Sequence, residues 1–324
     1  MSPPIRFYLP DKIPADMPPS PDVYWPGFRH YMRSGVYVWT VQTFQRLRNA
    51  GLHCDLSDQL PSEGILIAHR KSIPRDFIPP PTVLFVCLRA DATFHPFAHW
   101  HVVINRLALN PWYPSVYMPH WPQPGLIPRD PRRGNRLENA AFFGDDGCIA
   151  GEMRGDEWMS ILRELKLNWM RVPLEKWHDF SEVDVVVAIR DFVGKHRHAN
   201  KPPTKLFNAW HAGVPAILGR ESAYEHERRG PLDYLEARTL PDLVAALRRM
   251  RDEPELRRAM MANGRERARE SDPAAIAARW QEFLKDVLEP AYEKWRNASA
   301  WQRRFFRWNG LLKTKAQDWQ ERFY

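Results

Sequence analysis

Nearly continuous apolar runs alternate with amphipathic segments along most of the chain. Runs at residues 64–68 (GILIA), 82–88 (TVLFVCL) and 183–189 (VDVVVAI) are typical of strands that are buried on both faces of a parallel sheet. Apolar positions at helical spacing predict helices over residues 34–50 and 156–167. Since strands that alternate with helices form parallel sheets covered by those helices, the pattern predicts an α/β chain.

Further runs continue this alternation to the end of the chain. They predict strands at 5–9, 115–118, 140–143 and 214–218, and helices at 204–212, 240–251, 254–270 and 276–287. The proline-rich passage 119–136 is interpreted as an interdomain connection. We therefore expect one α/β domain over 1–136, a second over 137–285 and a helical segment over 286–324.

Length and composition agree with two domains inside a cell. A chain of 324 residues is natural for two domains of about 150 residues each. The three cysteines (Cys54, Cys87 and Cys148) are scattered and odd in number, which argues against a disulfide framework. The N-terminus lacks a signal-peptide pattern, and no run of 18 apolar residues occurs. These features predict a cytoplasmic protein.

The net charge of +8 has a local origin. Residues 291–324 carry eight cations and three carboxylates, so this segment supplies most of the excess. The rest of the chain is only mildly basic, which argues against a nucleic-acid partner.

Residues 201–227 (KPPTKLFNAWHAGVPAILGRESAYEHE) carry the strongest functional signal. Two prolines suit the start of a helix, Gly213 suits its end, and VPAIL is a short buried strand. The polar loop expected over 219–227 then lies at the carboxyl end of a strand, where open α/β sheets bind ligands. Lys201, Thr204 and Lys205 surround the helix N-terminus and suit a phosphate group.

The stretch Asn208 to Leu218 (NAWHAGVPAIL) resembles the nucleotide-sugar-binding half of GT-B glycosyltransferases, most closely the family 4-like branch (glycosyl transferases group 1). The resemblance extends over roughly residues 183–283. It implies two Rossmann-like, doubly wound domains facing a cleft, with the C-terminal helix crossing back to the first domain. It also implies a nucleotide-sugar co-substrate and no catalytic metal or other cofactor.

This chain departs from that family at one pair of positions. Many retaining members carry two glutamates eight residues apart, and Asn200 and Asn208 stand here instead. The roles of those glutamates in gripping the donor are not carried over, so the anomeric outcome is left open.

The resemblance and the local pattern together select a donor site in the second domain. Lys205, Lys201 and Arg190 are the cations expected to neutralise the departing diphosphate. Thr204 and Ser222 add hydroxyl donors, and Tyr224 and Glu225 are candidates for the ribose. The donor set is Arg190, Lys201, Thr204, Lys205, Asn208, Ser222, Tyr224 and Glu225.

Candidate acceptor chemistry follows the strand at 82–88. Asp91 is the candidate general base, and His99 or His101 could share that task. Gly35, Arg89 and His95 are expected on the acceptor side. A metal on the three histidines is the less favoured alternative, because no matching carboxylate–histidine set follows. For each histidine, an ordinary packed imidazole is the competing interpretation.

The C-terminal segment predicts an amphipathic helix. Its aromatic stripe, spaced by three and four residues, consists of Trp301, Phe305, Trp308, Leu312, Ala316, Trp319 and Phe323. Arg304, Lys315 and Arg322 flank this stripe. We slightly favour packing of the aromatic stripe on the first domain over peripheral contact of residues 291–324 with an anionic membrane.

Three functions are compatible with these observations. The leading hypothesis is a metal-independent glycosyltransferase that serves a glycan or lipid-linked acceptor in bacterial envelope polysaccharide or glycolipid synthesis. A nucleotide-sugar epimerase on the same scaffold, or a basic membrane- or nucleic-acid-binding protein, are the alternatives.

Overall fold

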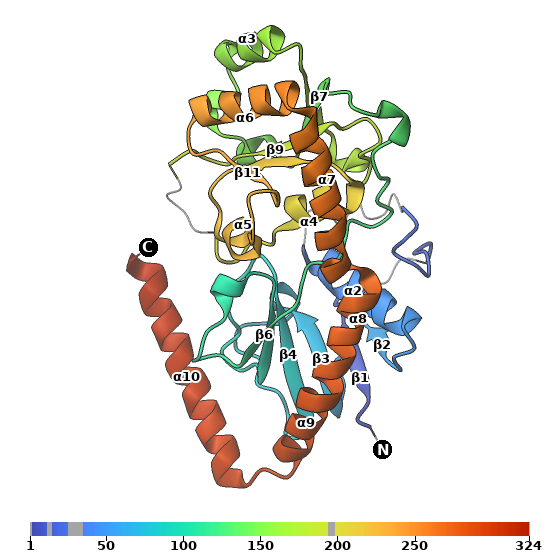
Figure 1. The fold of residues 1–324 in the computed structure, drawn as a ribbon. Helices are drawn as coiled ribbons and strands as arrows, with labels where there is room; N and C mark the ends of the chain where they lie inside the picture. Colours follow the sequence, from blue (N-terminus) through green and yellow to red (C-terminus); the bar gives the residue numbers. More distant parts are fainter. Residues whose placement is uncertain (1, 12–14, 25–34, 194–197, 324) are drawn as a thin grey trace.

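The structure is a computed structural model and describes residues 2–11, 15–24, 35–193 and 198–323. The described chain forms two lobes, each built on one sheet, and a long C-terminal helix (Figure 1). In the N-terminal lobe the strand order is β2 (Asp55–Ser57), β1 (Ile5–Tyr8), β3 (Gly64–His69), β4 (Val83–Arg89), β5 (Trp100–Val103) and β6 (Ser115–Tyr117). All neighbouring pairs are parallel.

The C-terminal lobe repeats this design. Its parallel sheet has the order β11 (Leu235–Glu236), β10 (Ala216–Leu218), β9 (Val185–Ala188), β7 (Asn139–Phe143) and β8 (Asn168–Val172). Its helices are α3 (Asp156–Glu164), α4 (Thr204–Ala212), α5 (Ser222–Glu227), α6 (Leu240–Asp252) and α7 (Pro254–Ala268). The wholly buried residues of β9 and β10 explain why these strands read as uninterrupted apolar runs.

Short 3-10 turns connect several of these elements. They span Arg70–Ser72, Arg106–Ala108, Pro131–Arg133, Asp146–Cys148, Gly151–Met153, Leu174–Lys176 and Arg269–Ser271.

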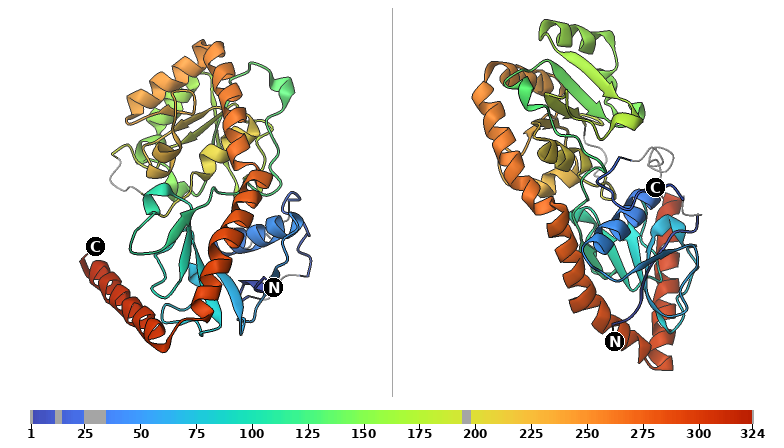
Figure 2. Two further views of the ribbon diagram at one scale, coloured as in Figure 1. Left: turned by 60° about the horizontal axis from the view of Figure 1, so that its bottom comes forward. Right: turned by 90° about the vertical axis from the view of Figure 1, so that its right-hand side faces the viewer.

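The last helices return to the N-terminal lobe. They are α8 (Pro273–Glu282), a π-helical segment (Phe283–Leu288), α9 (Glu289–Arg296) and α10 (Ala300–Phe323). Figures 1 and 2 show α7, α8 and α9 descending from one lobe along the other, and α10 turning back up the far side. Ile276, Trp280 and Leu284 are fully or almost fully buried in the N-terminal core. The return therefore starts near residue 273, before the boundary expected at 286, because this apolar stripe packs on α2 (Gly35–Asn49) and its sheet.

The predicted fold class is confirmed: two doubly wound parallel sheets with a helical C-terminus. The helix over 204–212 and its left-handed end at Gly213 (φ +67°) are as expected. Two local expectations are corrected. Residues 222–227 form α5 within the segment expected as a loop, and the short strands β2, β5, β8 and β11 were not predicted. These strands are only two to five residues long, so their periodicity is too short to be distinctive.

The helical tail packs on the N-terminal lobe, but the favoured prediction for its orientation is wrong. The inward face of α10 carries Phe306, Gly310 and Gln317, which contact the N-terminal lobe. The aromatic stripe points outward, with Trp301 and Trp308 among its exposed members. Among the described helices, none is both long and apolar enough to cross a bilayer.

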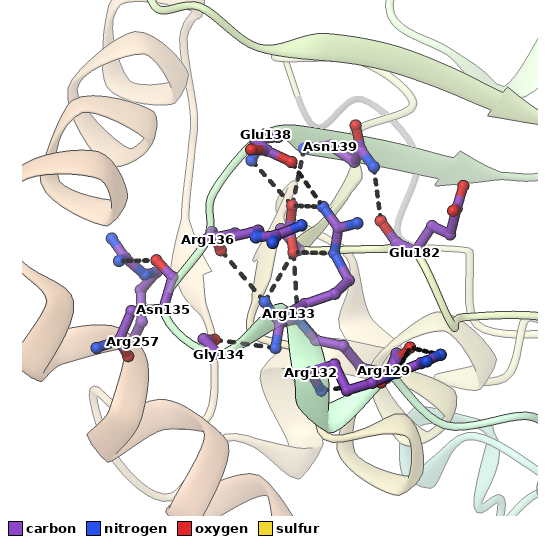
Figure 3. A network of polar contacts seen from close by, with 12 residues as sticks. Arg129, Arg132, Arg133, Gly134, Asn135, Arg136, Glu138, Asn139, Glu182 and Arg257 are labelled. Atoms are coloured by element: carbon purple, nitrogen blue, oxygen red, sulfur yellow. Dashed lines mark hydrogen bonds and ion pairs between the residues drawn. The ribbon is translucent and has the colours of Figure 1, made fainter.

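A buried ionic network holds the interdomain connection against the second sheet (Figure 3). The Asp184 carboxylate accepts from Arg129 Nη2 at 2.8 Å and from Arg133 Nη2 at 2.7 Å. It also accepts from the backbone N–H groups of Glu138 and Asn139 at 2.9 and 3.0 Å, where β7 begins. Burial by itself raises the pKa of Asp184, but these donors lower it below its ordinary value.

Loss of this carboxylate should strongly destabilise the protein. Asp184→Ala leaves the buried Arg129 without a counter-ion and Arg133 with only the exposed Glu138, which costs about 3–5 kcal/mol of unfolding free energy. Because the folded-state pKa of Asp184 is lowered, the difference from wild type should persist at neutral pH and shrink only below about pH 4. Urea unfolding followed by circular dichroism measures this difference. Asp252→Ala, which removes the carboxylate of the exposed Arg251–Asp252 pair, is the control and should leave the midpoint nearly unchanged.

Candidate functional site

A pocket lies where strands of the two sheets end opposite one another. It encloses about 270 Å³ and draws residues from both lobes. Parallel strands all point the same way, so the segments after β4, β7 and β9 converge on it. Its lining is Gly35, Val38, Trp39, Asp91, His120 and Gln123 from the N-terminal side, and Phe143, Gly144, Asp145, Cys148, Trp177, Phe180, Arg190, Lys201, Pro202, Thr204, Lys205 and Asn208 from the C-terminal side.

Three cations converge in this pocket. Arg190 follows β9, while Lys201 and Lys205 lie at the start of α4. Arg190 Nε lies 3.0 Å from Glu221 Oε1, and Lys201 Nζ lies 2.7 Å from Asp91 Oδ1. Within the described residues Lys205 has no such ion pair, although its Nζ lies 5.5 Å from the centre of the Phe142 ring. Asp145 also lines the pocket, but within the described residues Lys205 is the cation of these three whose charge no direct ion pair offsets.

The electrostatics of Lys205 reflect this imbalance. Burial and, next, the charge of Arg190 lower the pKa of Lys205 to about 8. Burial also opposes the charge of Arg190, but Glu221 keeps the pKa of Arg190 above its ordinary value. The N-terminal N–H groups of α4 add to the attraction for an anion, since no side chain caps this end among the described residues. An anion bound here would relieve the repulsion between the cations.

Asp91 stands opposite these cations on a strained turn. Its φ is +50°, a conformation that non-glycine residues rarely adopt. The Asp91 N–H donates to the carbonyl of Asn200 at 3.1 Å, so the second lobe holds this turn in place. A β-carbon added at Gly35 would lie 3.7 Å from Asp91 Oδ2 and 3.6 Å from His69 Nε2. Gly35 thus lies beside the Asp91 carboxylate in the pocket lining.

His69 stabilises this turn by a hydrogen bond to the residue before Asp91. It is fully buried at the end of β3. Its Nδ1 accepts from the Lys71 N–H at 3.1 Å, so Nε2 carries the proton that it donates to the Ala90 carbonyl at 3.0 Å. Burial lowers the pKa of His69 to about 4. The neutral ring therefore fixes the residue before Asp91.

Sequence reasoning missed His120. This residue lines the pocket, contacts the Trp39 ring edge-on at 4.9 Å and is nearly buried. Its Nδ1 bonds the Trp121 carbonyl, which can only accept, so Nδ1 carries the proton and Nε2 keeps its lone pair. Burial lowers the pKa of His120 to about 4, and it stays neutral at physiological pH. Its position just beyond β6 was the available signal, because strand ends mark ligand sites.

The other candidate histidines lie outside the pocket lining. His95 Nδ1 accepts from the Phe97 N–H at 3.1 Å, and His99 Nδ1 accepts from the Phe85 N–H at 2.9 Å. His101 Nε2 accepts from the His95 N–H at 3.1 Å. Burial lowers the pKa of His95 to about 4 and those of His99 and His101 to about 3. Each of these rings bonds the backbone through at least one nitrogen and lies outside the pocket lining, which favours the competing interpretation of packed imidazoles.

Four more candidates are placed away from the pocket lining. Ser222 is buried and its hydroxyl accepts from Asn105 Nδ2 at 3.0 Å across the lobe junction. Tyr224 is buried, and Glu225 pairs with Arg220 at 2.9 Å. The Arg89 guanidinium lies 4.1 Å from the centre of the Phe94 ring. By contrast Asn208 lines the pocket, and its Oδ1 accepts from the Gln123 N–H at 3.0 Å. This amide therefore links α4 to the interdomain connection.

Among the described residues, no group of three or more His, Cys, Asp or Glu side chains is arranged to hold a metal ion. The pocket lining combines three cations with Asp91, Asp145 and an aromatic wall. Phe143 and Phe180 stack at 4.1 Å within that wall.

Comparison with known proteins gave one family match and several distant structural matches. Residues 146–285 match the family described as glycosyl transferase-like. No curated protein matches the chain. Among solved structures, sucrose-phosphate synthase from Thermosynechococcus elongatus is 12% identical over 70% of this chain and 74% of that chain, with a TM-score of 0.47. WaaG, a glycosyltransferase involved in lipopolysaccharide biosynthesis, is 12% identical over 87% and 99%, with a TM-score of 0.46. AviGT4, a glycosyltransferase involved in avilamycin A biosynthesis, is 15% identical over 89% and 98%, with a TM-score of 0.43.

Two parallel-sheet lobes around a shared pocket define a protein of the GT-B class. The family match covers residues 146–285, the part of the chain that carries Arg190, Lys201 and Lys205. The resemblance to group 1 glycosyltransferases is thereby confirmed. The three solved structures are too distant to support any argument about individual residues.

Anion binding in this pocket should weaken as pH rises. Lys205 loses its proton above about pH 8, so the affinity for UDP or GDP should fall roughly tenfold between about pH 7 and pH 9. Lys205→Arg should flatten this dependence, because arginine stays charged over that range. Isothermal titration calorimetry at several pH values measures both. Lys285→Arg, an exposed position, should keep the wild-type profile, and a profile unchanged in Lys205→Arg would contradict the assignment.

Proposed function

We propose that this protein is a glycosyltransferase that moves a sugar from a nucleotide-sugar donor to a glycan or lipid-linked acceptor. The observation that carries the proposal is Lys205, a cation without a carboxylate partner among the described residues, in a pocket lined by both lobes. A buried positive charge of this kind is stabilised by a bound anion. The diphosphate of a nucleotide sugar supplies such an anion, and the family match supports this choice of ligand.

The donor diphosphate is expected at the start of α4. As the bond between sugar and diphosphate breaks, negative charge grows on the leaving oxygen. Lys205, Lys201 and the free N–H groups of α4 are placed to stabilise that charge without moving. Arg190 is held by Glu221 and adds a fixed positive charge at the end of β9. On this basis we propose that the reaction needs no metal ion and no cofactor.

Asp91 is proposed as the general base for an inverting reaction. An acceptor hydroxyl must lose its proton as it attacks the sugar, and Asp91 offers a partly exposed carboxylate on the opposite wall. Lys201 pairs with this carboxylate in the structure at 2.7 Å. A diphosphate beside Lys201 would compete for its ammonium group and weaken that pair. The Asp91 carboxylate would then be free to accept a hydrogen bond from the acceptor hydroxyl.

We also propose a cellular setting for this activity. On the basis of the sequence resemblance, the acceptor is an envelope polysaccharide or glycolipid, and the protein acts in the cytoplasm next to the membrane. The N-terminal side of the pocket suits an uncharged sugar acceptor, because, among the described residues, Asp91 is the charged residue that this side contributes, beside neutral residues such as Gly35 and Trp39.

Donor binding should be detectable by thermal shift. In a screen of UDP-, GDP-, CMP-, ADP- and dTDP-linked sugars, one base should raise the melting temperature in proportion to occupancy. Lys205→Ala should abolish most of this shift, whereas Lys285→Ala, which removes an exposed lysine, should retain it. If none of the nucleotide sugars stabilises the wild-type protein, the proposed donor class is wrong.

Turnover distinguishes transfer from isomerisation. With the stabilising donor, nucleotide release should depend on added acceptor, whereas an epimerase would alter the sugar without releasing nucleotide. Asp91→Asn should lower kcat by at least about a hundredfold while donor affinity stays within a few-fold of wild type. Asp58→Asn on the exposed surface is the matched control and should be fully active. Full activity of Asp91→Asn would remove this residue from the mechanism.

A further inference from the structure

Helix α10 is fixed to the N-terminal lobe by one face only. Arg75 Nη2 donates to the Thr314 carbonyl at 3.1 Å and to Gln317 Oε1 at 3.2 Å, and Arg75 Nη1 lies 2.7 Å from Asp318 Oδ1. Gln317 Nε2 donates to the Phe94 carbonyl and to the Tyr113 hydroxyl, each at 3.0 Å. These bonds anchor the second half of the helix.

Aromatic contacts anchor the first half. The Phe306 ring stacks on His99 at 4.5 Å and also contacts Trp295 at 4.9 Å. Gly310 lies directly against the Phe97 ring, where a β-carbon would overlap it. This close approach needs glycine. The helix is therefore an integral part of the lobe, and it packs on Phe97 and His99.

The opposite face of α10 is apolar and exposed. We define the outward face of α10 by its exposed residues, which are Trp301, Arg304, Phe305, Arg307, Trp308, Leu311, Leu312, Lys315 and Trp319. Trp301 is 70% exposed, Trp308 56% and Trp319 64%. Six of the fourteen exposed large apolar side chains in the described part of the chain lie on this one helix. An exposed cluster of this kind marks an interaction site.

The positive charges on the outward face indicate an anionic partner. Arg304, Arg307 and Lys315 are exposed, and among the described residues none of the three forms an ion pair with a carboxylate. Asp318 is turned to Arg75 on the docked side. Tryptophan and phenylalanine beside unpaired cations suit the boundary of an anionic bilayer, where rings sit among head groups and cations meet phosphates.

We propose that the outward face of α10 binds the surface of an anionic membrane. The helix is about 36 Å long by its 24 residues, and it lies on the outside of the lobe (Figure 2), so it can lie flat along a bilayer. It is not apolar enough to span one. A second copy of this chain fits less well, because pairing two outward faces would bring their cations together. This inference stands whether or not the pocket transfers sugar.

The position of α10 would place a bound membrane close to the pocket. The segment that carries Asp91 into the pocket continues within three residues to Phe94, whose carbonyl receives Gln317 of α10. Figure 1 shows the C-terminal end of α10 rising toward the junction of the two lobes. A bilayer along the outward face would therefore run beside the acceptor lobe.

Vesicle flotation of the full-length protein tests the proposal. The wild-type protein should float with vesicles in which about a third of the lipid is phosphatidylglycerol, and not with pure phosphatidylcholine. Arg304→Glu/Arg307→Glu/Lys315→Glu should weaken this binding roughly a hundredfold or more, because each cation contributes about fivefold. Trp301→Ser/Phe305→Ser/Trp308→Ser should also lose it, since the rings supply the buried apolar area.

Matched controls make the result specific to the helix. Arg163→Glu/Arg248→Glu/Arg265→Glu changes the net charge equally on the other lobe, and Leu60→Ser/Ile127→Ser/Met159→Ser removes similarly exposed apolar side chains. Both should bind like wild type, and all variants should keep the wild-type circular dichroism spectrum. The proposal is overturned if the wild type does not float or if the α10 variants float as it does. It is also overturned if the aromatic variant only abolishes a concentration-dependent dimer, which would show that a second copy covers this face.

Discussion

The return of the chain to its first lobe is the constraint from which the other features follow. Trp280 and Leu288 belong to the C-terminal quarter of the sequence, yet they are fully buried in the N-terminal core. Removing that apolar stripe from water is strongly favourable, so the return segment stays fixed to the first lobe while α7 packs on α4 of the second. The strand ends of both sheets are consequently held toward each other, and α10 is delivered to the outer side of the first lobe.

Polar contacts then set how the lobes meet. The Tyr117 hydroxyl donates to Glu227 Oε1 at 2.5 Å in a buried position, and burial followed by the charge of Glu227 raises the pKa of Tyr117. Asn105 donates to Ser222 in the same junction. Such bonds are directional and only modestly stabilising in net terms, so they fix alignment more than they supply free energy. The segment after β10 thus serves the junction, although its sequence looked like a ligand loop.

The pocket illustrates why some site residues could be read from the sequence and others could not. Lys201, Thr204 and Lys205 were found because a helix start after a proline pair has a known geometry. Asp91 and Arg190 were found because each directly follows a strongly apolar strand. His95, His99 and His101 follow the same strand, but all three are packed inside the lobe: His101 lies within β5, and Phe306 of α10 stacks on His99 from far away in the sequence. His120 was missed because the strand that precedes it, β6, is only three residues long and gives a weak apolar signal.

By itself the sequence determined the local structure of this protein: buried strands, helices with defined ends, two domains and a cluster of cations at one helix start. Those features depend on neighbours within a few residues, through periodicity, backbone conformation and helix-end electrostatics. Only the tertiary structure decided which face of α10 turns outward and which carboxylate meets Lys201. Both outcomes depend on long-range packing: a glycine-sized gap against Phe97 orients the helix, and the closed junction brings Asp91 to within 2.7 Å of its cation.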